Sequence, residues 1–202
     1  MARKPRQLMD VPNTLYHVVC RGVNQRNIFR RARDYKKFLK ILREAKRRFK
    51  FYLYVYNLLP NHSHLEIKTR DVSISKIMHF INTTYARYFN WRYNRVGHLF
   101  QDRFYSSVIN TEAYFWGVGA YIDLNAWRAE LTDEPENYPW SSFSVYNQKE
   151  YKDDLIDREE FLKLGGSGDT EKLRRAYVDF VKKRQRQPYK KLPKFISNER
   201  FL

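Results

Sequence analysis

Residues 51–69 read FYLYVYNLLPNHSHLEIKT, and this stretch decides the fold. Its first half is apolar and aromatic, a Pro-Asn pair interrupts it, and its second half alternates in polarity. This pattern predicts two strands joined by a tight turn, a β-hairpin. Alternate side chains of a strand point to the same face, so His62, His64 and Glu66 are expected on one face of the second strand.

The flanking sequence adds elements on both sides of this hairpin. They are a strand at 14–20, an amphipathic helix at 34–49 with Asp34 as its expected N-cap, a second helix ending near Trp91 and a short strand at 103–109. The resulting order is strand, helix, strand, strand, helix, strand. It predicts an α+β fold, a ferredoxin-like antiparallel sheet (βαββαβ) with helices on one face.

A third helix and a charged tail follow this unit. The segment at 111–127 has the pattern of a helix, and DTEKLRRAYVDFVKKR at 169–184 predicts another one. We expect a first domain over residues 1–150. Residues 151–202 are expected to form a basic C-terminal extension that carries the last helix.

The composition restricts the function classes. The 202 residues include 39 Lys and Arg against 22 Asp and Glu, which gives a net charge of +17, and 17% are aromatic. The aromatic content excludes a disordered basic tail, and the single cysteine excludes a disulfide framework or a zinc site built on several cysteines. No apolar run spans a membrane and no secretory signal is evident, so we expect a cytoplasmic protein that binds a polyanion, most simply nucleic acid.

Two groups of residues suggest phosphoryl chemistry. His62 and His64 on one strand face could hold a divalent ion together with the side-chain oxygen of Asn125. Tyr121 lies one helical turn before Asn125 and could attack a phosphodiester. Two neighbouring histidines are also typical of an ordinary surface, and Glu66 could either join the site or be solvated.

A family resemblance rests on five stretches in order, which are YHVVCRGVNQRNIF at 16–29, LLPNHSHLEIKT at 58–69, YARYFNWRYNRVGHLFQDRF at 85–104, AYIDLN at 120–125 and YPWSS at 138–142. The chain resembles the REP-associated tyrosine transposases, relatives of the insertion-sequence single-strand transposases in the HUH endonuclease superfamily. The resemblance implies a ferredoxin-like nuclease. It also implies a substrate of hairpin-bearing single-stranded DNA from repetitive extragenic elements.

The resemblance also implies roles for individual residues. His62, His64 and Asn125 would bind Mg²⁺ or Mn²⁺, and Tyr121 would form a 5′-phosphotyrosine link to DNA. No small-molecule cofactor is implied. The chain departs from the family pattern at Ser63, between the histidines, and at Ala126, where relatives carry proline.

Candidate DNA contacts are basic and aromatic residues near the first strand and the second helix. They are Arg21, Arg26, Arg87, Arg92, Arg95, Arg103, Tyr88 and Tyr93. Tyr85 and Trp91 are equally consistent with core or contact positions, and His17 is interpreted as structural.

Several alternatives stay open from sequence alone. They are a hairpin-binding protein that does not cleave, a tyrosine nickase of the replication-initiator or relaxase type, and an RNA-binding basic module. The chain could act as a monomer or a homodimer.

Overall fold

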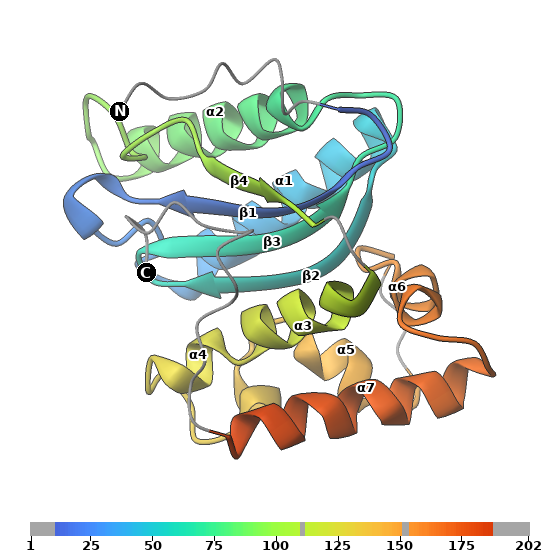
Figure 1. Ribbon diagram of the computed structural model, residues 1–202. Helices are drawn as coiled ribbons and strands as arrows, with labels where there is room; N and C mark the ends of the chain where they lie inside the picture. Colours follow the sequence, from blue (N-terminus) through green and yellow to red (C-terminus); the bar gives the residue numbers. More distant parts are fainter. Residues whose placement is uncertain (1–10, 110–111, 151–153, 188–202) are drawn as a thin grey trace, which may run out of the picture.

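The computed structural model describes residues 11–109, 112–150 and 154–187, and within these it forms a sheet flanked by helices (Figure 1). The strands are β1 (Leu15–Arg21), β2 (Tyr52–Leu59), β3 (His62–Lys68) and β4 (Tyr105–Val108). Their order in the sheet is β2-β3-β1-β4, and all neighbours are antiparallel. The predicted ferredoxin-like α+β sheet is therefore confirmed.

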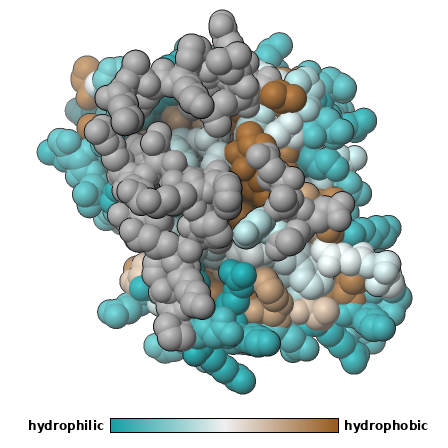
Figure 2. Space-filling view, viewed as in Figure 1, coloured by the Kyte–Doolittle hydropathy of each residue, from teal (hydrophilic) through white to brown (hydrophobic). Residues whose placement is uncertain are grey.

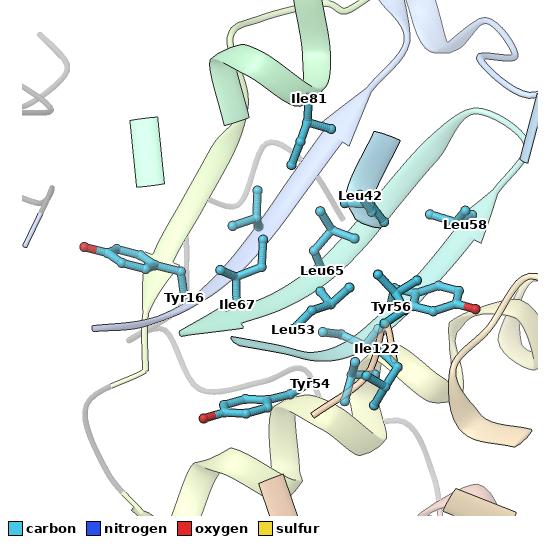
Figure 3. Packing of buried hydrophobic residues seen from close by; sticks show 14 of the residues in the cluster. Tyr16, Leu42, Leu53, Tyr54, Tyr56, Leu58, Leu65, Ile67, Ile81 and Ile122 are labelled. Atoms are coloured by element: carbon cyan, nitrogen blue, oxygen red, sulfur yellow. The ribbon is translucent and has the colours of Figure 1, made fainter. Parts of the chain in front are cut away.

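Two long helices cover one face of this sheet. These are α1 (Ala32–Phe49) and α2 (Ile74–Arg92), and they pack against each other. Leu42 of α1, Ile81 of α2 and Leu65 of β3 meet in the core between the layers (Figure 3). Full burial of each such side chain stabilises the fold by roughly 1.5–3 kcal/mol.

The start of α1 differs from the expected position. The N-cap is Arg31 rather than Asp34, which lies in the first turn. The Asp34 carboxylate accepts hydrogen bonds from the backbone N–H groups of Arg30 (2.9 Å) and Arg31 (3.0 Å). Asp34 thus accepts hydrogen bonds from backbone N–H groups that have no carbonyl partner at the start of the helix. The acidic residue of a capping box has the same role.

Shorter helices cover the opposite face. They are α3 (Glu112–Asp123), α4 (Asn125–Arg128), α5 (Phe143–Asn147), α6 (Arg158–Leu164) and α7 (Thr170–Gln185), with short 3-10 turns at Val23–Gln25 and Pro135–Asn137. Of these, α3 contacts β2 and β3 directly, and α7 packs on α3 and α5. The two helices of the predicted βαββαβ unit are α1 and α2, and both lie on one face as expected. The later helices cover the other face.

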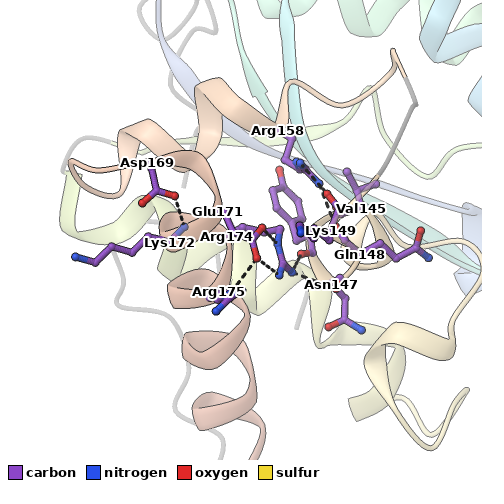
Figure 4. Close-up of polar contacts among 11 residues, drawn as sticks. Val145, Asn147, Gln148, Lys149, Arg158, Asp169, Glu171, Lys172, Arg174 and Arg175 are labelled. Atoms are coloured by element: carbon purple, nitrogen blue, oxygen red, sulfur yellow. Dashed lines mark hydrogen bonds and ion pairs between the residues drawn. The ribbon is translucent and has the colours of Figure 1, made fainter.

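Two arginines hold the C-terminal helices in place through hydrogen bonds to backbone carbonyl oxygens. Arg174 of α7 donates to the carbonyl oxygens of Tyr146 (2.9 Å) and Asn147 (3.1 Å), while Arg158 donates to that of Val145 (3.1 Å; Figure 4). The expected helix at 169–184 is confirmed, with Asp169 as its N-cap. The division into two domains at residue 150 stays a prediction.

The surface is mainly hydrophilic at its margins on the face shown in Figure 2, with hydrophobic residues nearer the centre. Among the residues that the structure describes, no helix is both long and apolar enough to cross a membrane.

Candidate active site

Three histidines share one face of the sheet, the face that α3 covers. In the register between β1 and β3, His64 lies opposite Val19, His62 opposite Arg21, and His17 opposite Glu66. Paired residues of antiparallel strands point to the same face. The rings of His62 and His64 therefore lie near each other, with their centres 4.9 Å apart.

The Nδ1 atoms of both candidate metal ligands are engaged. His62 Nδ1 donates to the side-chain oxygen of Asn61 at 2.6 Å. His64 Nδ1 lies 2.9 Å from Nε2 of His17, whose ring stacks on that of His64. When His64 donates this hydrogen bond, Nε2 of both His62 and His64 carries a lone pair. Such outer hydrogen bonds orient metal-binding histidines.

The electrostatics of the site favour neutral imidazoles. The pKa of His62 is lowered to about 4, first by burial and then by the charge of Arg21. The pKa of His64 is lowered well below its usual value by burial and by the neighbouring His62 and His17. The rings are therefore uncharged near pH 7, which is the form that binds a metal ion.

A hydrogen bond from β2 places Tyr121 beside these rings. Asn57 lies opposite His64 in β2, and its side-chain nitrogen donates to the carbonyl oxygen of Ile122 at 2.8 Å. This contact fixes the end of α3 against the sheet. The Tyr121 ring then meets His17 and His64 edge-on, with ring centres 5.9 and 6.0 Å apart. The structure thus brings Tyr121 against His64, one member of the histidine pair.

Asn125 begins α4, a helix that contacts β2 near the end of the sheet where β3 starts (Figure 1). Its side-chain nitrogen is buried and finds no hydrogen-bond partner among the described residues. Two neutral imidazoles and an amide oxygen are donor types that a divalent cation such as Mn²⁺ or Mg²⁺ accepts. No group of three or more His, Cys, Asp or Glu suited to a metal occurs within the described ranges, so the fit depends on the amide as third ligand.

Arg128 is a site residue that the sequence analysis missed. Its guanidinium lies 5.4 Å from the centre of the Tyr121 ring, and one nitrogen donates to the Tyr121 carbonyl oxygen at 3.1 Å. Arg128 lies one residue beyond the helix expected at 111–127 and seven residues after Tyr121. Continuing that helix by one residue would have placed both on one face, and this was the available signal. A guanidinium over the face of an aromatic ring makes a cation–π contact.

Glu66 is fully buried, which excludes the alternative of a solvated side chain at this position. Neither carboxyl oxygen finds a hydrogen-bond partner in the described part of the chain. Burial and then Asp123 raise the pKa of Glu66 well above its usual value. A Cβ on Gly119 would come within 3.3 Å of Glu66 and 2.8 Å of the Tyr177 hydroxyl. This glycine therefore serves the close packing of α3 against Phe161 of α6, Tyr177 of α7 and Glu66 of β3.

The predicted DNA contacts divide into two groups. Arg21 lies opposite His62, next to the histidine pair, and its Nε is buried without a partner among the described residues. The others lie around α2 and its neighbouring loops. Of these, Arg26, Arg87, Arg92 and Arg103 are exposed, and Arg95 is half-buried over the ring of Phe89.

The aromatic candidates near α2 are distinguished by their environment. Tyr88 and Tyr93 donate their hydroxyls to the two carboxylate oxygens of Asp34, at 3.0 and 2.7 Å. Their hydroxyls therefore hold α1 to α2, and their roles as DNA contacts stay predictions. Tyr85 is fully buried, whereas Trp91 is 79% exposed. Trp91 is therefore the most exposed aromatic ring of this group.

A comparison with protein families covers the two histidines, Tyr121 and Asn125. The profile of the family described as IS200-like transposases matches residues 10–125, more than half of the chain. The chain belongs to the IS200-like transposase family. Among curated proteins, none matches this transposase.

A solved structure resembles the fold of this transposase. It is a REP-associated tyrosine transposase bound to a REP hairpin, with a TM-score of 0.62 and 16% sequence identity. The similarity covers 78% of the present chain and 94% of the other. The fold that the family resemblance implied is thereby shown.

Proposed function

We propose that this transposase binds hairpin-bearing single-stranded DNA and cleaves and rejoins it through Tyr121. The observation that carries the proposal is the contact between the Tyr121 ring and the His64 ring, which come from two elements distant in sequence. The solved relative bound to a REP hairpin supports the choice of a hairpin substrate.

The chemistry is a transesterification in which each bond broken is replaced by one formed. The Tyr121 oxygen attacks the phosphorus and forms a bond to the 5′-phosphate, while the bond from phosphorus to the 3′ oxygen breaks. The phenol proton leaves to solvent and the released 3′ oxygen takes up a proton. The phosphotyrosine keeps the energy of the diester, so attack by a 3′-hydroxyl rejoins the strand.

His62, His64 and Asn125 are the residues that would hold the metal ion. A bound divalent cation supplies Lewis-acid polarisation of the phosphate and stabilises its developing negative charge. Arg21 lies next to His62 and carries an unpartnered buried nitrogen within the described part of the chain. It is positioned to hold a non-bridging phosphate oxygen.

A hairpin-binding protein without cleavage is the second candidate. It is favoured by the burial of Tyr121, whose side chain is only 5% exposed. Cleavage therefore requires the end of α3 to move away from the sheet enough for a phosphate to enter. Such local movements accompany substrate binding in many enzymes.

An end-labelled DNA hairpin with single-stranded flanks distinguishes these candidates. Incubation with Mn²⁺ or Mg²⁺ should give a protein–DNA adduct that survives denaturation. Tyr121→Phe should abolish the adduct, and Tyr114→Phe, on the same helix, should retain it. Adduct formation by Tyr121→Phe would exclude Tyr121 as the nucleophile. Binding without any adduct from the wild type would favour the second candidate.

A further inference from the structure

Two amide side chains near the candidate metal ligands carry complementary atoms without hydrogen-bond partners. The Asn57 side-chain oxygen is buried and has no partner in the described part of the chain, and the same holds for the Asn125 side-chain nitrogen. One of these atoms is an acceptor and the other is a donor. Buried polar atoms in proteins are almost always hydrogen-bonded, so each of the two calls for a partner.

The orientation of the Asn57 amide is set by its nitrogen. This nitrogen donates to the carbonyl oxygens of Ile122 at 2.8 Å and Asp123 at 3.4 Å, at the end of α3. Only the nitrogen end of an amide can donate, so the oxygen end cannot take its place against these carbonyls. The Asn57 oxygen is thereby left as a buried acceptor of fixed orientation.

Asn57 lies at a rigid position in the sheet. On one side of β2 it is opposite His64 of β3, and on the other side it bridges to Ser141. The N–H group of the next residue, Leu58, donates to the Trp140 carbonyl oxygen at 3.0 Å. Side chains on such a supported strand orient their neighbours more precisely than side chains on a loop.

The contact with α3 also brings Asn125 toward Asn57. Asp123, whose carbonyl oxygen receives the Asn57 nitrogen, precedes Asn125 by two residues. Asn125 begins α4, and both α3 and α4 pack along β2 on the face away from α1 and α2 (Figure 1). The unpartnered acceptor and the unpartnered donor therefore lie on elements that are in direct contact.

A metal ligand of the asparagine type has to be oriented. A divalent cation such as Mg²⁺ binds the oxygen of an amide, because the amide nitrogen has no lone pair to offer. The nitrogen of the ligand must then face an acceptor elsewhere. Hydrogen bonds from outside the ligand set fix metal ligands in this way. The Asn57 oxygen is an acceptor of this kind beside Asn125.

We infer that Asn57 is a positioning residue that accepts a hydrogen bond from the Asn125 side-chain nitrogen and so presents the Asn125 oxygen to the metal ion. The inference rests on the proposed function, in which Asn125 is a metal ligand. Rotation of the Asn125 side chain would form this bond. One amide on β2 would then hold the end of α3 through its nitrogen and orient the ligand of α4 through its oxygen.

A double-mutant cycle in Mn²⁺ affinity tests this inference without depending on cleavage. Calorimetric titration measures the wild type, Asn57→Leu, Asn125→Ala and the double variant, and circular dichroism checks that each is folded. The matched control is Asn82→Leu, in α2 on the opposite face of the sheet. Asn82 is also buried, and its nitrogen also donates to a backbone carbonyl oxygen, that of Arg103 at 2.8 Å.

Asn57→Leu should weaken Mn²⁺ binding by about 10- to 100-fold, the usual effect of removing an outer hydrogen bond to a metal ligand. In the Asn125→Ala background the same substitution should change the affinity by less than about twofold, because Asn57 acts through Asn125. Asn82→Leu should keep the wild-type affinity. An equal loss in both backgrounds would overturn the inference, as would an unchanged affinity in Asn57→Leu.

Asn57→Asp separates the two ends of the side chain and provides the test if Asn57→Leu does not fold. Its carboxylate still accepts from Asn125 but cannot donate to Ile122. NMR with Mg²⁺ should show slow solvent exchange of one Asn125 side-chain proton in both the wild type and Asn57→Asp. Faster exchange in Asn57→Asp would contradict the orienting role. Absence of Mn²⁺ binding by the wild type would contradict the proposed metal site and this inference with it, whereas failure of the cycle alone contradicts only the role of Asn57.

Discussion

At the scale of single residues, His17 holds the candidate metal ligand His64 in place. It is buried, and its Nε2 lies 2.9 Å from Nδ1 of His64. The sequence showed that His17 lies in a strand, but not that β1 pairs with β3 in a register that aligns these rings. The interpretation of His17 as structural is consistent with this contact, and we predict in addition that His17 orients His64.

His17→Ala should weaken Mn²⁺ binding by about 10- to 100-fold, the usual effect of removing an outer hydrogen bond to a metal ligand. His17→Gln retains a side-chain acceptor and should recover part of the affinity. Calorimetric titration with Mn²⁺ measures both variants. Unchanged Mn²⁺ affinity in His17→Ala, with the fold intact, would contradict the positioning role.

Arg128 provides a second prediction at this scale. Its guanidinium faces the Tyr121 ring. Removing a cation from an aromatic face costs roughly 1–2 kcal/mol, so Arg128→Ala should slow adduct formation by about tenfold. Hairpin affinity should stay close to that of the wild type. Rapid quench of the adduct-forming reaction and anisotropy separate the two effects, and a decrease confined to affinity would assign Arg128 to DNA binding.

At the scale of elements, two carboxyl groups are buried where α3 packs on β3. Glu66 and Asp123 are both fully buried, and the Tyr177 hydroxyl of α7 donates to Asp123 at 2.7 Å. Burial raises the pKa of Asp123 to about 8. The packing of α3 and α7 on the sheet therefore depends on a carboxyl group that stays protonated near neutral pH.

The raised pKa of Asp123 predicts a pH dependence of stability. The folded state keeps its proton up to about pH 8, whereas the unfolded chain loses it above the ordinary aspartate pKa of 3.8. Between these values the free energy of unfolding falls by about 1.4 kcal/mol for each unit by which the pH rises. Asp123→Asn cannot ionise, so its stability relative to the wild type should rise from pH 5 to pH 8.

Urea denaturation of the wild type and Asp123→Asn at pH 5 and pH 8 measures this difference. A stability gain that is the same at both pH values would show that Asp123 is not the titrating group. Asn keeps a carbonyl acceptor for Tyr177, so the hydrogen bond between α3 and α7 is retained in the variant.

The elements differ in how well the sequence predicted them. The hairpin and both long helices follow from local periodicity, which the flanking turns reinforce. The single helix expected at 111–127 is divided at Leu124 into α3 and α4. The burial of Glu66 was not predictable, because strand alternation gives its face but not that α3, α6 and α7 cover that face.

At the scale of the whole molecule, part of the net charge of +17 is concentrated in three places. One is the exposed group around α2 with Trp91, and another is Arg21 beside the histidines. The third is the group of cations at the end of α1 and after β3, which are Arg43, Lys46, Arg47, Lys50 and Arg70. The sequence indicated the first two. The third depends on the packing of the end of α1 beside the segment after β3, which no local pattern specifies.

This distribution predicts a steep salt dependence of DNA binding. The logarithm of the binding constant should fall with the logarithm of salt concentration by about 0.7 for each single-stranded phosphate contacted and about 0.9 for each in the stem. A flanked hairpin should therefore show a steeper slope than its flank alone. Anisotropy across a salt series measures both, and two flat slopes would show that the net charge is incidental to binding.

Covalent bonding of Tyr121 to DNA is the event on which the proposed function depends. Mass spectrometry of the digested adduct measures this directly, because the peptide that contains Tyr121 acquires the mass of a nucleotide through a phosphate. We predict fragment ions that place this mass on Tyr121. Attachment to any other residue, or a wild-type digest in which that peptide is wholly unmodified after strand cleavage, would contradict the proposed role of Tyr121.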